Sequence, residues 1–162
     1  MNGVIYQRDL FGQNEDLRER FDFVVSFGVV EHFDDPRVPL RAMRRFLRPG
    51  GRLLTTTPNL DPGSLTVRVR RIIGPRILAM HKLMSLDDLR SFHEQAGFKT
   101  ISCTYEGMGL NLEADVKNFR NKFIQEFFFR AVQATRKLIE VLHLDPPNTR
   151  LTGYLMVYVG EA

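Results

Sequence analysis

Four histidines are the side chains of this sequence best suited to moving a proton near neutral pH, because imidazole titrates close to that range. His93 falls on a predicted helix that begins at Ser85, at a position that we expect to face solvent. His143 ends a long helical pattern, where a cation complements the negative end of the helix dipole. His32 and His81 remain as site candidates. Each has a structural alternative: a hydrogen-bonded role for His32 and a plain surface position for His81.

Metal and thiol chemistry find little support in the sequence. His32 directly follows Glu31, and one such pair supplies too few ligands for a metal ion, so we predict no metal site. The single cysteine, Cys103, excludes an internal disulfide and any Cys-x-x-Cys motif. It lies in a predicted strand, where a cysteine is more often a core residue than a nucleophile.

Length and composition indicate one globular domain. The chain has 162 residues, of which 43% are hydrophobic and 26% are charged. No apolar run is long enough to cross a membrane, and the amino terminus lacks the pattern of a secretory signal. Together with the single cysteine, these features predict a cytoplasmic protein.

The net charge of +4 is modest, but basic residues gather in one stretch between residues 68 and 82. A solvated helix face is the plain interpretation of this stretch. The alternative is contact with phosphate or with an anionic membrane surface, on which Val67–Ile73 would lie. We expect no nucleic acid partner, because the stretch lacks the interleaved aromatic residues that stack on bases.

Hydrophobic periodicity places the candidate residues among alternating strands and helices. Predicted strands cover residues 3–9, 21–27, 52–58, 98–105 and 154–159. Predicted helices run from Asp34 or Asp35 to the Pro-Gly-Gly at 49–51, over 65–72, from Ser85 to Gly97, and over 112–144. Two strands joined by a helix form a parallel crossover unit. The alternation therefore predicts an α/β fold with an open sheet and with ligand sites at the carboxyl ends of its strands.

Residues 21–60 carry several motifs whose order and spacing together resemble one family. The motifs are Phe21-Asp22, Glu31-His32, Asp35-Pro36 and Leu47-Arg48-Pro49-Gly50-Gly51, supported by Ser85-Leu86-Asp87-Asp88-Leu89 and Ala96-Gly97-Phe98. This pattern is similar to the middle of a class I S-adenosylmethionine-dependent methyltransferase. The resemblance implies a partial Rossmann-like α/β sheet, mostly parallel with an antiparallel last strand and with helices on its faces.

The resemblance also implies a single domain, 1–162, that lacks the amino-terminal part of the family fold. Residues 1–60 would form the central strands and the crossover helix, 61–84 a lid-like segment, and 85–162 a helix, a long helical insertion and the final strands. The family's glycine-rich turn, which holds the cofactor, has no counterpart before residue 21. Close backbone approach there requires glycine, because a Cβ would collide with the cofactor. We therefore expect weak S-adenosylmethionine binding, as for a fragment of a longer enzyme.

The resemblance further implies which residues meet the cofactor and the substrate. Cofactor contacts fall on two segments, Asp9 and Leu10 beside the adenine, and Ser26, Phe27 and Gly28 beside the methionine part. On the substrate side, His32 would act as the catalytic base, with Glu31, Asn59 and His81 as contacts of a small-molecule acceptor. Glu31 has the alternative of anchoring its own loop.

A rival hypothesis is a non-catalytic remnant that serves as a protein-interaction module. In the family a further strand lies beside the one at residues 21–27, so we expect that strand to form an exposed edge here. Unpaired edges favour association, so self-association through this edge is one expectation. The second candidate surface is the helix over 112–144, whose apolar face is wider than a single core contact needs.

Overall fold

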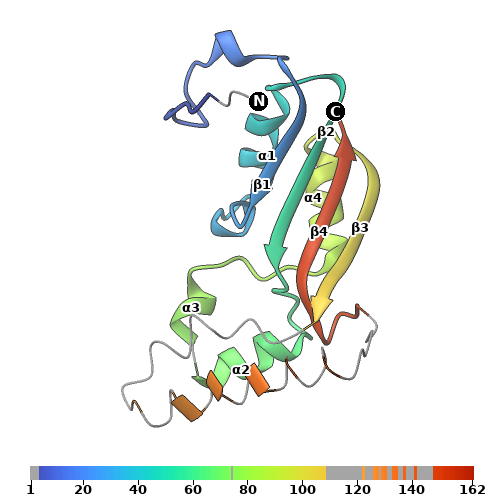
Figure 1. Ribbon diagram of the computed structural model, residues 1–162. Helices are drawn as coiled ribbons and strands as arrows, with labels where there is room; N and C mark the ends of the chain where they lie inside the picture. Colours follow the sequence, from blue (N-terminus) through green and yellow to red (C-terminus); the bar gives the residue numbers. More distant parts are fainter. Residues whose placement is uncertain are drawn as a thin grey trace.

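One sheet of four strands forms the centre of the protein, in the order β1-β2-β4-β3 (Figure 1). The computed structural model describes residues 4–73, 75–108 and 148–162, together with scattered residues between 122 and 141. The strands are β1 (Phe21–Phe27), β2 (Leu47–Pro58), β3 (Lys99–Met108) and β4 (Gly153–Glu161). β1 pairs parallel with β2, and β4 pairs antiparallel with both β2 and β3. Three strands therefore run one way and the last runs the other way, which confirms the predicted α/β sheet.

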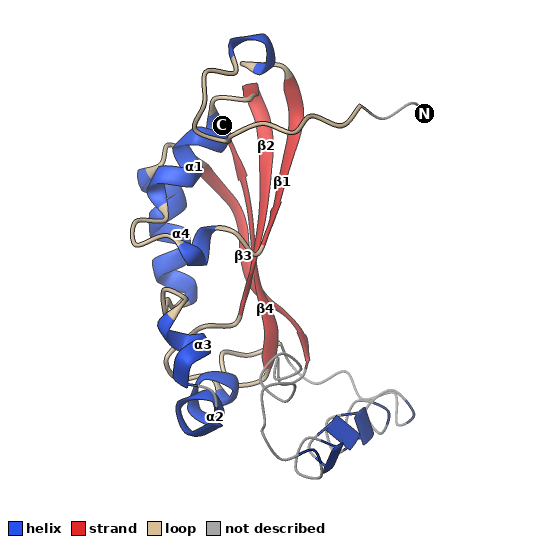
Figure 2. Cartoon of the chain, turned by 90° about the vertical axis from the view of Figure 1, so that its left-hand side faces the viewer, coloured by secondary structure: helices blue, strands red, loops and turns tan. Residues whose placement is uncertain are grey.

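The helices that pack on the sheet lie along one of its faces (Figure 2). The helical elements are η1 (Glu15–Leu17), η2 (Val30–His32), α1 (Arg37–Arg44), α2 (Leu65–Ile73), α3 (Pro75–Ala79) and α4 (Leu86–Gln95). α1 contacts β2, while α4 contacts β3 and β4. The resemblance implied helices on the faces of the sheet, and the labelled helices of the described residues lie along one of them.

The β1–α1–β2 unit is the predicted parallel crossover, with a shorter helix than the sequence indicated. The Asp35 carboxylate accepts the Arg37 N–H at 3.0 Å and so satisfies one free amide of the first turn. Leu40 and Met43 form the buried stripe of α1. The Pro-Gly-Gly expected to end the helix lies inside β2 instead, where Gly50 adopts a φ of +76° that favours glycine.

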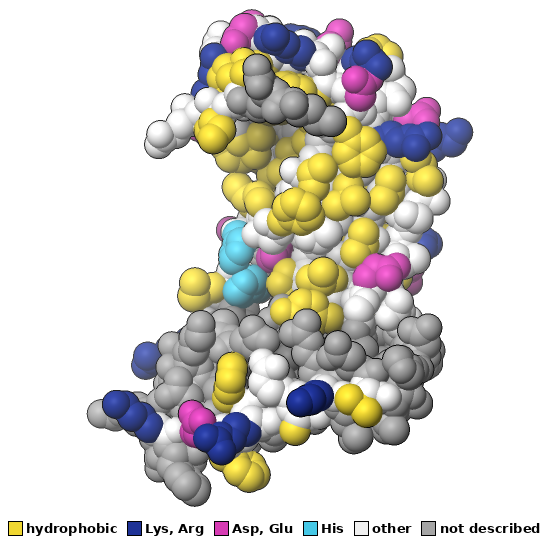
Figure 3. Space-filling model, viewed as in Figure 1, with side chains coloured by type: hydrophobic (Ala, Val, Ile, Leu, Met, Phe, Trp, Pro, Cys, Tyr) yellow, Lys and Arg dark blue, Asp and Glu magenta, His cyan; other side chains and the backbone are white. Residues whose placement is uncertain are grey.

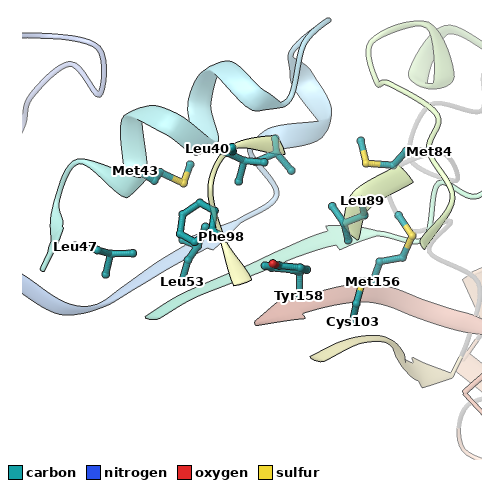
Figure 4. Packing of buried hydrophobic residues seen from close by; sticks show 12 residues of the cluster. Leu40, Met43, Leu47, Leu53, Met84, Leu89, Phe98, Cys103, Met156 and Tyr158 are labelled. Carbon is teal, nitrogen blue, oxygen red and sulfur yellow. The ribbon is translucent and has the colours of Figure 1, made fainter. Parts of the chain in front are cut away.

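The hydrophobic core fills the space between α1, α4 and the sheet (Figure 4). Its members include Leu40, Met43, Leu47, Leu53, Met84, Leu89, Phe98, Cys103, Met156 and Tyr158. α4 begins as predicted, with Ser85 as its N-cap and a reciprocal capping box to Asp88. Cys103 is buried in this core, in agreement with its interpretation as a core residue.

The expectation that His93 faces solvent is wrong. Its side chain is fully buried between α4 and the sheet. Nδ1 lies 2.7 Å from the Leu89 carbonyl oxygen, Nε2 lies 3.0 Å from Thr55 Oγ1, and the ring stacks on Tyr158 with centroids 3.7 Å apart. His93 lies four residues after Leu89, so both side chains lie on the stripe of α4 that meets the sheet.

The strand predicted over 3–9 is also wrong for the residues that the structure describes. Residues 4–9 have no regular secondary structure, and Ile5 is 97% exposed. A strand is stable only where a neighbour pairs with its backbone, and β1 pairs with β2 alone among the described strands. β1 is therefore one edge of the described sheet, as the sequence analysis expected.

The remaining helices differ in how well the sequence predicted them. α2 confirms the helix expected over 65–72, whereas α3 falls in a stretch expected to be a loop. The long helix expected over 112–144 lies mostly outside the described residues. Among the described helices, none combines the length and apolar character that a membrane crossing requires.

Candidate active site at the carboxyl ends of the parallel strands

Gly28 ends β1 and turns the chain toward η2. Its φ of +63° lies in the region that favours glycine, and its N–H donates to the Thr56 carbonyl oxygen of β2 at 2.9 Å. The nearest atom to a Cβ built on Gly28 would be Glu31 Oε1 at 3.5 Å. Little else crowds this turn, so it leaves the backbone beside the carboxyl ends of β1 and β2 accessible to a ligand.

Glu31 is a buried carboxyl group next to this turn. Its side chain is 1% exposed, and Oε2 has no hydrogen-bond partner among the described residues. Burial raises the pKa of Glu31, opposed by a backbone hydrogen bond and by the charge of His32. The carboxyl group therefore keeps its proton to a higher pH than an exposed glutamate.

His32 and His81 come together although they lie 49 positions apart in the chain. Their ring centroids are 4.5 Å apart, and His32 Nδ1 lies 3.3 Å from the Met80 carbonyl oxygen. Figure 3 shows histidine side chains at the surface in the middle of the molecule, next to apolar side chains. The structure thus brings together the two histidines that the sequence analysis selected.

The segment after α3 is tied to η2 by Lys82. Its N–H donates to the Glu31 carbonyl oxygen at 2.7 Å, and its Nζ donates to the Asp34 carbonyl oxygen at 2.6 Å. These bonds fix the end of the 61–84 segment against the loop that follows β1. They explain why His81 lies beside His32.

Asp9 and Leu10 lie in a tight turn that adjoins η2. The Asp9 carboxylate accepts the Phe11 N–H at 3.0 Å, and Leu10 packs against the core. Phe11 meets Phe33, the residue after η2, in an edge-to-face contact with centroids 5.7 Å apart. The predicted adenine-side segment therefore lies near the predicted reaction zone, without the strand that was expected to hold it.

Asn59 is separated from solvent. Its side chain is fully buried, and its Nδ2 donates to the carbonyl oxygens of Arg150 and Gly153, both at 2.9 Å. Its Oδ1 accepts the Asp61 N–H at 3.2 Å. These bonds give Asn59 a structural function between β2 and β4, so substrate contact by this side chain stays a prediction without geometric support.

Asp61 is the centre of a polar cluster that the sequence analysis missed. Its buried carboxylate accepts from Arg150 Nε at 2.6 Å, from the Gly63 N–H at 2.7 Å and from Tyr105 Oη at 3.0 Å. Burial, and after it the Asp61 carboxylate, raises the pKa of Tyr105 to about 12. An aspartate three residues after the Pro58 that ends β2 was the local signal for this cluster.

Buried polar atoms without partners gather where the parallel strands end. They are Ser26 Oγ, Glu31 Oε2 and Thr57 Oγ1. Ser26 pairs with Thr55, so Ser26 and Thr57 point to the same face of the sheet. A buried polar group without a partner is costly, so a ligand or an ordered water at this place would be stabilising. Among the described residues, no group of three His, Cys, Asp or Glu side chains could hold a metal ion.

Comparison with known protein families gives one match that covers most of the chain. Residues 3–103 match the sequence model of a family described as a methyltransferase domain. The chain is 33% identical over 92 residues to a ubiquinone biosynthesis O-methyltransferase of Dinoroseobacter shibae. That alignment covers 51% of this chain and 36% of the relative, so the chain spans about a third of the relative's length.

Solved structures show the same fold at low sequence identity. A possible histamine N-methyltransferase from Thermotoga maritima superposes with a TM-score of 0.57 and 17% identity, over 89% of this chain and 56% of that one. Phosphoethanolamine N-methyltransferase 2 of Haemonchus contortus, solved with S-adenosyl-L-methionine, gives 0.54 and 16%, over 89% of this chain and 34% of that one. At these identities the likeness is evidence for the fold alone.

Proposed function

This chain belongs to the methyltransferase domain family, and from that premise we propose that it takes part in S-adenosylmethionine-dependent methyl transfer to a hydroxyl group of a small molecule. One observation carries the proposal. Gly28, with its left-handed backbone, lies two residues before η2, which presents His32 beside His81. The family relation supports S-adenosylmethionine as the cofactor. The geometry supports binding of the acceptor beside His32 and His81.

The residues at the end of β1 fit one half of such a cofactor. Gly28 allows close backbone approach, and the unpaired atoms of Ser26 and Glu31 offer hydrogen bonds beside it. Phe27, which is 70% exposed, offers an apolar surface next to the same turn. Asp9 and Leu10 would hold the adenine end from the neighbouring segment.

When bound, S-adenosylmethionine supplies an electrophilic methyl group that needs no activation by the protein. The residues of this chain would align the acceptor and exclude water. With Nδ1–H donating to the Met80 carbonyl oxygen, His32 Nε2 is free to accept a proton from the acceptor hydroxyl. A positioned base of this kind accelerates a reaction by about 10²- to 10⁴-fold.

An aromatic hydroxyl is the acceptor that we propose for this site. Three observations support it: the similarity to a ubiquinone biosynthesis O-methyltransferase, the paired imidazole rings, and the exposed apolar side chain of Phe27. A phenolic proton is acidic enough for an imidazole to remove it in the transition state. His81 would contact the ring of such an acceptor, and Glu31 would hold the loop that carries His32.

We further propose that residues 1–162 form one incomplete domain that binds the cofactor weakly by itself. The sequence holds no glycine-rich turn between residues 1 and 21, and within this chain we assign the backbone contact to the amino-acid end of the cofactor to Gly28. Calorimetry with S-adenosylhomocysteine should give a dissociation constant in the millimolar range. A micromolar or tighter constant would contradict this part of the proposal.

The site itself is tested by nuclear magnetic resonance titration with S-adenosylhomocysteine, which does not require turnover. Amide shifts should centre on residues 26–31 and on Asp9 and Leu10. Gly28→Ala should abolish them, whereas Gly97→Ala, which replaces another left-handed glycine at the end of α4, should keep them. Shifts that survive Gly28→Ala would refute the site.

The base is tested by transfer of a labelled methyl group to 3,4-dihydroxybenzoate. His32→Gln should lower the turnover rate by about 100-fold or more. His81→Gln should chiefly raise the Michaelis constant, because we assign it a contact with the acceptor. Equal rates for the wild-type chain and His32→Gln would remove His32 as the base.

The alternative function is that of a non-catalytic interaction module. The apolar side chains that β1 exposes, Phe23, Val25 and Phe27, favour it. If the titration finds no cofactor binding to any segment of the chain, this second function becomes the better account of the fold.

A further inference from the structure

The segment that carries His81 is hydrogen-bonded to η2 on both sides of that residue. His32 Nδ1 donates to the Met80 carbonyl oxygen at 3.3 Å, and the Lys82 N–H donates to the Glu31 carbonyl oxygen at 2.7 Å. His81 lies between these two contacts, and its ring centroid is 4.5 Å from that of His32. Because the two bonds fix the backbone before and after His81, they hold its ring beside His32.

The side chain of Lys82 adds a third contact to the same loop. Its Nζ donates to the Asp34 carbonyl oxygen at 2.6 Å and lies 5.7 Å from the centroid of the Phe92 ring on α4. A hydrogen bond from a charged donor is stronger than one between neutral groups, and an ammonium over an aromatic ring adds attraction. One side chain thus joins the end of the 61–84 segment to the loop after η2 and to α4.

The plain alternative for Lys82 is a surface lysine that stabilises the fold slightly, as exposed ion pairs do. Two observations favour a more specific role. The backbone and the side chain of Lys82 both bind the loop that carries His32, at carbonyl oxygens three residues apart. Lys82 is also the direct neighbour of His81, the residue to which we assign contact with the acceptor.

The Met80 carbonyl oxygen determines the tautomer of His32. A carbonyl oxygen only accepts hydrogen bonds, so Nδ1 carries the proton and Nε2 of the neutral ring is the acceptor. The proposed base needs this form, because Nε2 must take the proton of the acceptor hydroxyl. A bond of this length is lost when Met80 moves away by about 1 Å, and His32 is then free to exchange between its two tautomers.

We propose that Lys82 is a positioning residue for the pair of His32 and His81. Its ammonium holds residues 80–82 against the loop after η2, and the Met80 carbonyl oxygen in turn holds His32 in the form that acts as a base. This role rests on the function proposed above, which makes His32 the base and His81 the acceptor contact. The effect of Lys82 on the His32 tautomer is observable without cofactor or acceptor.

Three variants separate position from charge. Lys82→Met removes the ammonium, keeps a side chain of similar length beside Phe92, and keeps the backbone bond to Glu31. Lys82→Arg keeps a cation that reaches the Asp34 carbonyl oxygen, so it should behave as the wild-type chain does. Lys99→Met is the matched control, because it removes the same charge from an exposed position at the amino-terminal end of β3, at the opposite end of the sheet from the candidate site.

Nuclear magnetic resonance of the imidazole nitrogens reports the tautomer of His32 directly. At a pH above the range in which imidazole titrates, the wild-type chain, Lys82→Arg and Lys99→Met should all show the Nδ1–H form. Lys82→Met should show a mixture of both tautomers and a weaker nuclear Overhauser contact between the two histidine rings. In methyl transfer to 3,4-dihydroxybenzoate, Lys82→Met should lower turnover roughly tenfold, which is the value of one hydrogen bond from a charged donor.

Three results would overturn the proposal. A wild-type chain in which His32 carries its proton on Nε2 contradicts the assigned bond to Met80, and this test needs no variant. A pure Nδ1–H form in Lys82→Met shows that Lys82 only stabilises the fold. An equal mixture of tautomers in Lys99→Met and Lys82→Met shows that charge rather than position matters. If the tautomer depends on Lys82 as expected but the wild-type chain transfers no methyl group, Lys82 keeps its positioning role and the function proposed for the site is wrong.

Discussion

Acidification should destabilise this protein through His93, which is neutral and buried. The ring is held by the Leu89 carbonyl oxygen, by Thr55 Oγ1 and by the face of Tyr158. Burial penalises the charged imidazole, and it lowers the pKa of His93 from 6.5 to about 4 against the opposing effect of the Leu89 hydrogen bond. A proton added at Nε2 would lie in the core without a carboxylate partner.

The size of the effect follows from the two pKa values. Between pH 6.5 and about 4 the unfolded chain binds a proton that the folded core excludes, so the free energy of unfolding rises with pH in this range. The full contribution is present above pH 6.5 and is lost progressively as the pH falls. A difference of about 2.5 pKa units corresponds to about 3 kcal/mol, a large share of the stability of a typical domain.

The assay is urea unfolding at a series of pH values, for the wild-type chain and for His93→Phe. Phenylalanine keeps the stacking on Tyr158 but cannot titrate, so the difference between the two chains isolates the contribution of His93 from that of the carboxylates. Thr55→Val is the control. It removes the hydroxyl partner of Nε2, should lower the stability by about 1 to 3 kcal/mol at every pH, and should keep the pH slope.

Parallel curves for the wild-type chain and His93→Phe would refute this reasoning. They would mean either that His93 protonates freely in the folded state or that the core opens before the proton binds. The chemical shifts of the imidazole nitrogens decide between these two explanations, because a buried neutral ring with Nδ1–H should keep its tautomer down to about pH 5.

Three further expectations concern the polar cluster around Asp61 and the thiol of the core. Asp61→Asn should lower the pKa of Tyr105 from about 12, yet keep it above 10 because burial is the larger cause; an unchanged ultraviolet titration would contradict this. Gly63→Ala places a Cβ 2.6 Å from the Arg150 guanidinium and should cost about 1 kcal/mol of unfolding free energy, measured in urea. Burial raises the pKa of Cys103 to about 11, so Ellman's reagent should react with it only on unfolding; rapid reaction in native buffer would show that the thiol is accessible.

Patterns that span only a few residues correctly predicted several strands and helices. The capping box at Ser85 and Asp88 predicted the start of α4, because both partners lie within one helical turn. The continuous run of β-branched and aromatic residues at 21–27 predicted β1, and the apolar run at 154–159 predicted β4. The residues within each of these elements are enough to predict it, so the prediction does not depend on contacts with distant parts of the chain.

The predictions that proved wrong depended on contacts across the chain. Residues 3–9 have strand-like composition, yet a strand needs a neighbour, and β1 pairs only with β2 among the described strands. His93 was misplaced because the interpretation used Phe92 to define the buried face of α4, while the four-residue spacing from Leu89 also placed His93 against the sheet. Thr55 lies in the middle of a predicted buried strand, and a hydroxyl at such a position needs a polar partner. That partner is His93.

The candidate site was only partly accessible to sequence reasoning. The pairing of His32 with His81 follows from the Lys82 hydrogen bonds to Glu31 and Asp34, which no spacing in the sequence reveals. The contact between Arg150 and Asp61 spans 89 positions of the chain and is equally invisible. The chemistry of imidazole singled out the histidines as candidates, but tertiary packing determines which of them lie in contact.

The distribution of unpaired polar atoms supports the proposed site independently of any family resemblance. Of the four buried side-chain atoms that lack a partner in the described chain, three belong to Ser26, Glu31 and Thr57, around the turn at Gly28. Each such atom costs about 1 to 3 kcal/mol unless a ligand or a water satisfies it. Polar groups elsewhere in the interior, such as Asn59 and His93, have their partners within the protein. Three of the four unpaired atoms lie together at the carboxyl ends of two parallel strands, and this grouping supports the binding site that we propose there.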